Sequence, residues 1–140
     1  MADLHIGDFY RDVAGVLLAL YRNFPQPSIL FVEDLVGAQE PDAFGVPAPR
    51  HLACYSAMLW LAEEGFLRYT DVIRQDGLDQ CVLTERGFVV LCTPDRSLID
   101  ADLPASIARQ KATLAQQLRD ALASGSSTQL ADAVQRCFQR

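Results

Sequence analysis

Lysine is absent from the first 95 residues of the chain, which hold six arginines and fourteen acidic residues, a net charge of −8. Residues 96–140 hold six basic and four acidic residues, a net charge of +2. A surface that binds phosphates needs clustered Lys and Arg, so the longer and acidic part of the chain lacks the usual electrostatic footprint of a nucleic-acid binder. The charge pattern therefore disfavours DNA as the partner of residues 1–95.

Long hydrophobic runs are also missing. No apolar stretch of the sequence approaches the roughly 20 residues that a membrane helix needs. The amino-terminal segment MADLHIGDFYRD has acidic residues where a secretion signal carries a basic segment. We therefore expect a cytoplasmic protein with no membrane partner.

Residues suited to metal or catalytic sites are few. The chain has four cysteines, none of them in a CxxC pair, and its two histidines are His5 and His51. In a reducing compartment we expect free thiols, and the spacing of these residues does not match a zinc site. The sequence also lacks a glycine-rich phosphate loop, a nucleophile elbow and a local Cys–His pair. We expect a protein that is not an enzyme and that uses no cofactor or metal.

Half of the 140 residues are hydrophobic, enough for one domain with a core, or a core plus a small appendage. Apolar residues recur over 6–23 at the spacing of one helical face, which predicts a helix that Pro25 and Pro27 end. A very short strand over 28–30 and a short helix over 31–36 are expected next.

We expect Gly37 to end the short helix, because glycine readily adopts the left-handed backbone conformation that often follows a helix. Residues 38–49 contain three prolines and no periodic pattern, so we expect a loop of about a dozen residues. Residues 50–64 predict a helix that Pro49 begins and Gly65 ends. This helix is apolar on nearly every side and is therefore expected to be buried on nearly all sides.

A hairpin and two further helical regions follow. Residues 66–73 alternate as a strand does, and the partner strand is expected over 80–83 across a Gln75-Asp76-Gly77 turn in which Gly77 tolerates a positive φ. Thr84 is suited to cap a helix over 85–91.

After Pro94, residues 104–123 repeat apolar residues at helical spacing, and the segment SGSS at 124–127 interrupts them. Ser127 or Thr128 can cap a last helix that carries apolar residues on one face. The two regions are expected to form a helical hairpin.

The order of these elements, with EEGFLRY leading into the hairpin and LTERGFVVL leading out, resembles the winged helix-turn-helix superfamily, in particular PadR-like and MarR-like bacterial regulators. The resemblance covers residues 8–92 and is most specific at LTERG (83–87), which is similar to the Leu-Thr-x-x-Gly that often follows the second wing strand. It implies an α+β, mainly helical fold: a winged helix, with a three-helix core and a β-hairpin wing, over residues 1–95. A C-terminal helical hairpin over residues 96–140 is then expected to be an oligomerisation or packing element, since added helices usually make the dimer in such regulators.

The resemblance places a recognition helix at residues 50–64 and a wing tip at residues 74–79. The polar groups there that suit contacts with phosphates or base edges are Arg50, His51, Tyr55, Ser56, Arg68 and Arg74. Two departures count against DNA binding: the helices before and after residue 37 are joined by a dozen residues instead of about 3–4, and acidic residues surround the wing arginines. The alternative is that Arg68 and Arg74 are ordinary solvated residues.

The apolar third helix and the C-terminal hairpin are candidate interfaces, because Trp and Tyr are enriched at interface centres. The candidates are Tyr55, Met58, Trp60, Ile107, Leu114, Leu118, Leu130, Val134 and Phe138. The alternative is that these side chains only fill the core. The sequence favours a non-enzymatic winged-helix module for protein–protein interaction that self-associates as a homodimer and has a further, unidentified protein partner. The alternative function is a dimeric DNA-binding transcriptional regulator.

Overall fold

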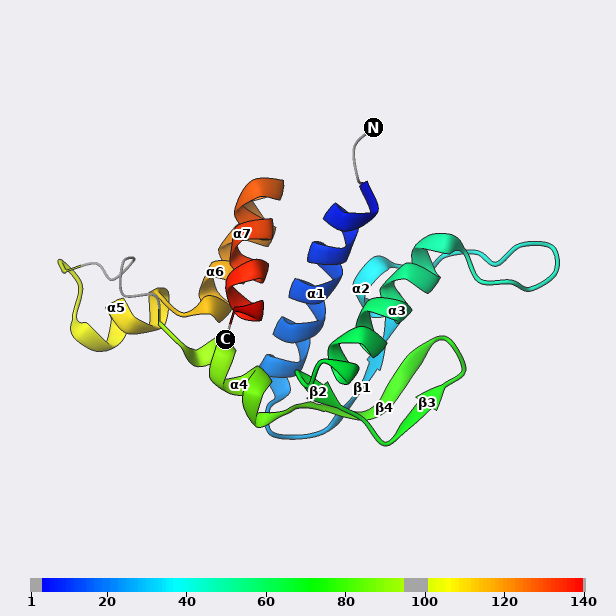
Figure 1. The fold of residues 1–140 in the computed structure, drawn as a ribbon, viewed down its shortest axis with the longest axis horizontal. Coiled ribbons are helices and arrows are strands. Elements are labelled where there is room, and N and C mark those ends of the chain that lie inside the picture. Colours follow the sequence, from blue (N-terminus) through cyan, green and yellow to red (C-terminus); the bar gives the residue numbers. More distant parts are fainter. Residues whose placement is uncertain (1–3, 95–100, 140) are drawn as a thin grey trace.

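Helices make up most of the chain, and a small antiparallel sheet accompanies them in an α+β arrangement (Figure 1). The computed structural model describes residues 4–94 and 101–139. Its helices are α1 (Leu4–Asn23), α2 (Val32–Val36), α3 (Pro49–Glu63), α4 (Glu85–Cys92), α5 (Ala105–Lys111), α6 (Leu114–Ser124) and α7 (Ser127–Phe138). Its strands are β1 (Ser28–Phe31), β2 (Leu67–Arg68), β3 (Asp71–Ile73) and β4 (Gly77–Leu83). The predicted helix over 6–23, the strand over 28–30 and the helix over 31–36 are confirmed within one or two residues.

Helix α1 lies at the centre of the molecule, between α3 on one side and the α6–α7 pair on the other (Figure 1). Its buried residues cover much of its middle and its C-terminal half: Asp12, Val13, Ala14, Val16, Leu17, Leu18 and Leu20. All of them except Asp12 join a single hydrophobic cluster that also contains apolar side chains from α3, α4, α6, α7 and the sheet. The core is therefore built around the first helix of the chain.

The sheet is organised around β4, which pairs with β1 on one edge and with β2 and β3 on the other. The prediction of one strand over 66–73 is wrong, because Tyr69 and Thr70 separate β2 from β3. Gln80 lies opposite this break in β4 with a φ of 49°, in the left-handed region, and so interrupts the regular ladder. The predicted partner strand over 80–83 is longer than expected and begins at Gly77.

The turn between β3 and β4 uses a different residue from the one expected. Arg74 has the positive φ, 51°, whereas Gly77 already lies in β4. A Cβ atom on Gly77 would lie 2.6 Å from the carbonyl oxygen of Leu30 in β1. Glycine is therefore needed at 77 for the close approach of two strands and not for its backbone freedom.

The segment LTERG joins the sheet to α4 as the sequence predicts. The Thr84 hydroxyl accepts a hydrogen bond from the Gly87 amide (3.2 Å) and donates one to the Gly65 carbonyl (2.6 Å). A Cβ atom on Gly87 would overlap the carbonyl oxygen of Phe66. The cap is confirmed, and the glycine of this motif allows α4 to pack directly on the backbone that precedes β2.

The C-terminal region differs from the prediction in two places. The helix expected over 104–123 is broken at Ala112 and Thr113, where Thr113 caps α6 through the Gln116 amide and forms an isolated bridge with Pro94. The cap of α7 is Ser126 and not Ser127 or Thr128. Helices α6 and α7 pack on each other and on α1, so the expected hairpin shares the core of the preceding elements. The predicted domain boundary between residues 95 and 96 lies outside the described residues.

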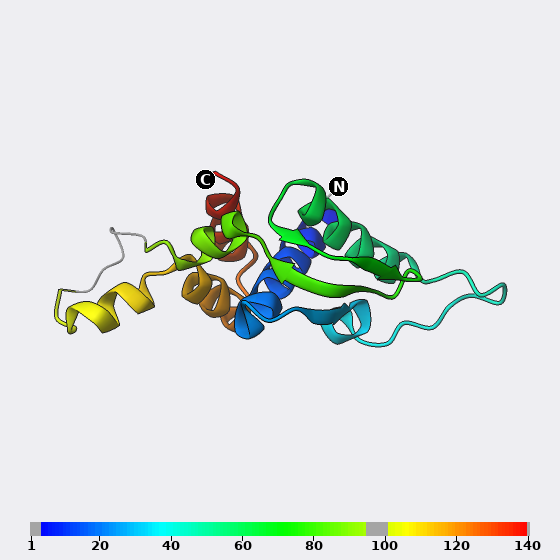
Figure 2. The same cartoon turned by 90° about the horizontal axis from the view of Figure 1, so that it is seen from below.

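Helix α3 is not buried on nearly all sides, contrary to the prediction. One face, which includes Cys54, Met58 and Leu61, packs into the core, while Ala53, Ser56 and Trp60 are exposed. The reason is that α1, α2 and β2 pack on α3 and leave the face with Ala53, Ser56 and Trp60 uncovered. Figure 2 shows the sheet on one side of α3. Among residues 4–94 and 101–139, no helix is both long and apolar enough to cross a membrane.

Two glycine substitutions test the assigned backbone conformations, because they are expected to change the free energy of unfolding in opposite directions. Gly7→Ala in α1 should raise the free energy of unfolding by about 0.5–1 kcal/mol, because a Cβ there meets no atom within 4 Å and alanine favours a helix. Gly125→Ala should lower it by about 1 kcal/mol, because Gly125 caps α6 with a φ of 72°. Urea unfolding followed by circular dichroism measures both changes, and equal signs would contradict one of the assignments.

Candidate functional site

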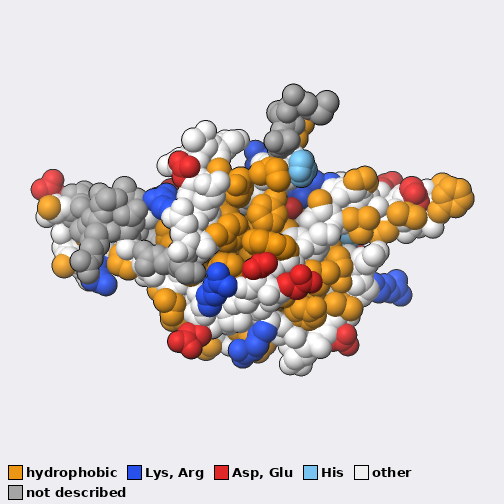
Figure 3. All heavy atoms as spheres, in the orientation of Figure 1, with side chains coloured by type: hydrophobic (Ala, Val, Ile, Leu, Met, Phe, Trp, Pro, Cys, Tyr) orange, Lys and Arg blue, Asp and Glu red, His pale blue; other side chains and the backbone are white. Residues whose placement is uncertain are grey.

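A groove with almost purely apolar walls lies between the first half of α1 and the exposed face of α3. Its volume is about 310 Å³, at the low end of the range for small ligand pockets, about 300–1,000 Å³. It is lined by His5, Ile6, Phe9, Asp12, Ala53, Ser56, Ala57 and Trp60. We refer to it as the α1–α3 groove. Figure 3 shows hydrophobic side chains gathered in the middle of the face that carries it.

One end of the groove is an aromatic cluster that joins three helices. The ring of Trp60 from α3 lies 5.3 Å from Phe9 of α1 and 5.3 Å from Phe138 of α7, both in edge-to-face geometry. Such pairs contribute about 0.5–1.5 kcal/mol beyond the burial of their surface, so they hold the indole in one orientation. Trp60 nevertheless stays 36% exposed. The cluster therefore presents an oriented aromatic surface to solvent.

An ion pair borders the groove at Asp12, one of its lining residues. The Arg50 guanidinium donates to both carboxylate oxygens of Asp12, one at 2.8 Å, and lies 3.8 Å from a carboxylate oxygen of Asp8. Asp12 is only 3% exposed. The hydrogen bond to Asp12 raises the pKa of Arg50, so its charge is permanent but already neutralised. Arg50 therefore links α1 and α3 through an ion pair. It does not offer an unengaged guanidinium for binding a phosphate, as the sequence had suggested.

His51 and Tyr55 both contact the turn between β3 and β4, residues 74–76. The Nε2 atom of His51 donates to the Gln75 carbonyl at 2.7 Å and lies 3.4 Å from a carboxylate oxygen of Asp76. The Tyr55 hydroxyl donates to the carbonyl of Arg74 at 3.2 Å, and burial raises the pKa of Tyr55. Both side chains, expected as DNA contacts, use a polar atom, Nε2 of His51 and the hydroxyl of Tyr55, to hold this turn against α3.

The remaining candidate DNA contacts are exposed but lie apart. Ser56 belongs to the α1–α3 groove, whereas Arg68 and Arg74 lie on the strands and the turn. The exposed face of α3 (Ala53, Ser56, Trp60 and Glu63) contains no positive charge. The structure therefore does not bring the six candidates together as one basic surface.

The nine candidate interface residues divide by burial. Five of them lie in the core: Met58, Leu114, Leu118, Leu130 and Val134. The hairpin thus directs its apolar side toward α1 of the same chain, and these side chains are not available at the surface. Tyr55 and Phe138 are half-buried, while Trp60 and Ile107 are exposed. Of these four, Trp60 and Phe138 belong to the aromatic cluster.

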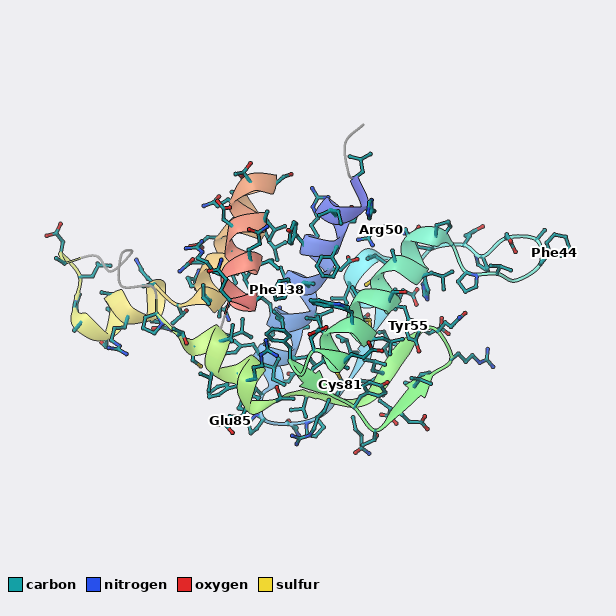
Figure 4. All side chains as sticks on the ribbon, viewed as in Figure 1. Phe44, Arg50, Tyr55, Cys81, Glu85 and Phe138 are labelled. Atoms are coloured by element: carbon teal, nitrogen blue, oxygen red, sulfur yellow. The ribbon has the colours of Figure 1, made fainter. Side chains whose placement is uncertain are left out.

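The loop expected over 38–49 is confirmed, except that Pro49 already belongs to α3. Sequence reasoning did not single it out as a candidate binding surface. We call residues 37–48, between α2 and α3, the arm. Residues 37–46 are all exposed, and Phe44 near the tip is 93% exposed. Figure 2 shows the arm extending from the body, and Figure 4 shows Phe44 at its far end. An aromatic residue inside a proline-rich loop was the available signal. Phe9 was also missed, because its place on the apolar face of α1 predicted a core residue.

Chemically reactive groups are sparse in the part of the chain that the structure describes. No three His, Cys, Asp or Glu side chains gather there as a metal site would require. All four cysteines are free thiols. Cys54, Cys81 and Cys137 are buried, and burial raises the pKa of each to about 12.

These pKa values predict selective thiol chemistry. At about pH 8 a thiol reagent such as dithionitrobenzoate should modify the half-buried Cys92 alone, because only a thiolate reacts and the other three thiols stay protonated and covered. Raising the pH to about 9 should not release them, since that is still far below their pKa. Peptide mapping of the modified protein identifies the site, and unfolding in urea is the control that makes all four available. Fast modification of a second cysteine in the folded protein would contradict the assigned burial.

Comparison of the chain with known protein families, with curated proteins and with solved structures finds no match.

Proposed function

We propose that the protein is a non-enzymatic protein–protein interaction module of the winged-helix type that self-associates as a homodimer. The topology supports the winged-helix assignment. Helix, strand, helix and helix (α1, β1, α2, α3) are followed by a strand–turn–strand unit, and β4 lies between β1 and β2 in the sheet. In this interpretation α3 is the helix that a DNA-binding relative places in the major groove, and the β3–β4 turn is the tip of the wing.

The apolar character of the α1–α3 groove carries the proposal. Base edges and phosphates are bound by Arg, Lys, Asn and Gln side chains, whereas the exposed face of α3 offers Ala53, Ser56, Trp60 and Glu63. Arg50 in α3, which is bonded to the groove residue Asp12, is neutralised by that carboxylate. An exposed tryptophan in an apolar depression is instead the composition of a protein-binding hot spot.

Self-association is measured by light scattering on the purified protein, together with a titration of labelled random duplex DNA at low salt. We expect a mass of twice 15.5 kDa and no binding of the duplex. The reason for using low salt is that the non-specific electrostatic attraction on which DNA readers depend is strongest there. A monomer that binds the duplex with an affinity falling steeply as salt rises would overturn the proposal.

A dimeric DNA-binding regulator is the second candidate, and exposed arginines on the wing favour it. Arg68 and Arg74 are both solvent-accessible on the strand–turn–strand unit. If the wing contacts phosphates, the double variant Arg68→Ala/Arg74→Ala should reduce both the affinity for duplex DNA and its dependence on salt. Arg22→Ala, an exposed arginine on α1, is the matched control. An unchanged salt slope in the double variant would count against this function.

A further inference from the structure

The arm exposes apolar side chains on a stiffened segment of chain. Phe44 is 93% exposed and Val46 is 50% exposed. Pro41 and Pro47 lie on either side of them, and proline restricts the backbone to one region of φ. Binding residues lie disproportionately on loops held by a rigid scaffold, and the arm offers two apolar side chains in such a position.

The tip of the arm is held by its own hydrogen bonds. One carboxylate oxygen of Asp42 accepts from the amides of Phe44 (2.8 Å) and Val46 (2.9 Å). The Asp42 amide donates to the Val46 carbonyl (2.9 Å), and the Gly45 amide donates to the Asp42 carbonyl (3.0 Å). The turn therefore presents Phe44 in a defined conformation, which reduces the ordering entropy lost when it binds a partner.

The arm and the groove of one chain lie on different sides of α3. The arm borders the β3–β4 turn, where Gln39, Pro41 and Pro47 line a depression together with residues 74–76. The α1–α3 groove shares none of these lining residues, and α1 forms its other wall. Phe44 therefore does not occupy the groove of its own chain.

We propose that Phe44 of one copy inserts into the α1–α3 groove of a second copy, and that the second copy returns the same contact. This inference rests on the proposed self-association and assigns its contact surface. The phenyl ring enters between Ile6, Ala53 and the exposed face of Trp60, where a further edge-to-face aromatic pair forms. When both copies make this contact, each groove is occupied by the other copy's Phe44 and no arm or groove remains for a third copy. The assembly therefore stops at two subunits.

The size of the two surfaces agrees with a stable dimer. Each chain contributes the ten exposed arm residues 37–46 and the eight residues that line the groove. Standard interfaces involve about 20–30 residues a side, so arm and groove offer up to eighteen residues toward one such surface. A second copy is the occupant favoured here, because the same chain carries both an apolar projection and an apolar depression.

The test uses one variant on each side of the contact in the full-length chain. Phe44→Ala removes the inserted ring, and Ala53→Arg fills the groove from an exposed helix position that accepts a long side chain. Each should weaken dimerisation at least about 100-fold, measured by sedimentation equilibrium, because each removes two identical contacts worth about tenfold or more apiece. Val89→Ala, at an exposed apolar residue of α4, is the matched control and should leave the dimer unchanged.

Mixing the two variants provides the decisive result. A heterodimer of Phe44→Ala with Ala53→Arg still has one intact contact, the Phe44 of the second chain in the groove of the first. The equimolar mixture should therefore dimerise about tenfold more tightly than either variant alone. Circular dichroism of each variant checks that the fold is unchanged.

The possible failures are distinguishable. Two outcomes would overturn the contact between Phe44 and the groove while self-association stands. In one, the wild-type protein is a dimer that both variants leave intact; in the other, the mixture dimerises no more tightly than either variant alone. If the wild-type protein is monomeric, the proposed function fails together with the exchange.

Discussion

A chain that ends after residue 94 is expected to be unfolded. Helices α6 and α7 place Leu114, Leu118, Leu130 and Val134 in the same core as α1. Burying one such aliphatic side chain stabilises a protein by about 1.5–3 kcal/mol. The loss of these four side chains is therefore similar to the whole stability of a typical domain, about 5–15 kcal/mol, and it also uncovers one side of α1.

Urea titration followed by far-ultraviolet circular dichroism tests this expectation, since the shortened chain should show no cooperative transition. Two point variants separate packing from simple loss of chain length. Leu118→Ala, at a fully buried position, should cost about 2–5 kcal/mol, whereas Ile107→Ala, at a position 42% exposed, should change the stability by less than about 0.5 kcal/mol. A shortened chain that unfolds cooperatively near the wild-type midpoint would instead establish residues 1–94 as an independent domain.

Arg50→Ala is expected to lower the free energy of unfolding by about 3–5 kcal/mol. The substitution leaves the Asp12 carboxylate, which is 3% exposed, without the guanidinium that binds both of its oxygens. An uncompensated buried charge is among the most destabilising single changes known in proteins. The pKa of Arg50 is raised, so the guanidinium loses its charge only above that raised value. The positive charge of the ion pair is therefore present throughout the ordinary pH range.

Arg11→Ala is the matched control for this prediction. Arg11 is 57% exposed and lies 3.6 Å from Asp8, so its loss should cost no more than about 0.5 kcal/mol. The double variant Asp12→Leu/Arg50→Leu should regain much of the stability lost in Arg50→Ala, because neither charge then remains. If Arg50→Ala unfolds no more easily than Arg11→Ala, the Asp12 carboxylate has found solvent or another donor.

The elements that the sequence predicted correctly are those with local signals. Helix α1 follows from its apolar periodicity and from the prolines that follow it, and α4 follows from the Thr84 cap. The breaks were not predictable, because they depend on distant contacts. Thr113 interrupts the expected helix over 104–123 where it bridges to Pro94, and no glycine or proline marks the place.

The candidate site was harder to predict for the same reason. Arg50 looked like a phosphate contact because its partner, Asp12, lies 38 positions away in the sequence. The groove is assembled from residues 5–12 and 53–60, and each segment alone resembles an ordinary apolar helix face. Periodicity shows which face of a helix is apolar, but it does not show whether another element covers that face.

The central position of α1 also has a consequence for how the chain matures during translation. Roughly 100 residues separate the end of α1 from the start of α7, which packs on it. At about 5–20 residues per second, a nascent chain therefore carries α1 without α7, which packs on it, for about 5–20 seconds. Ribosome-bound intermediates of this protein should accordingly be good substrates for chaperones, and the native state should form only once the final helix has been synthesised.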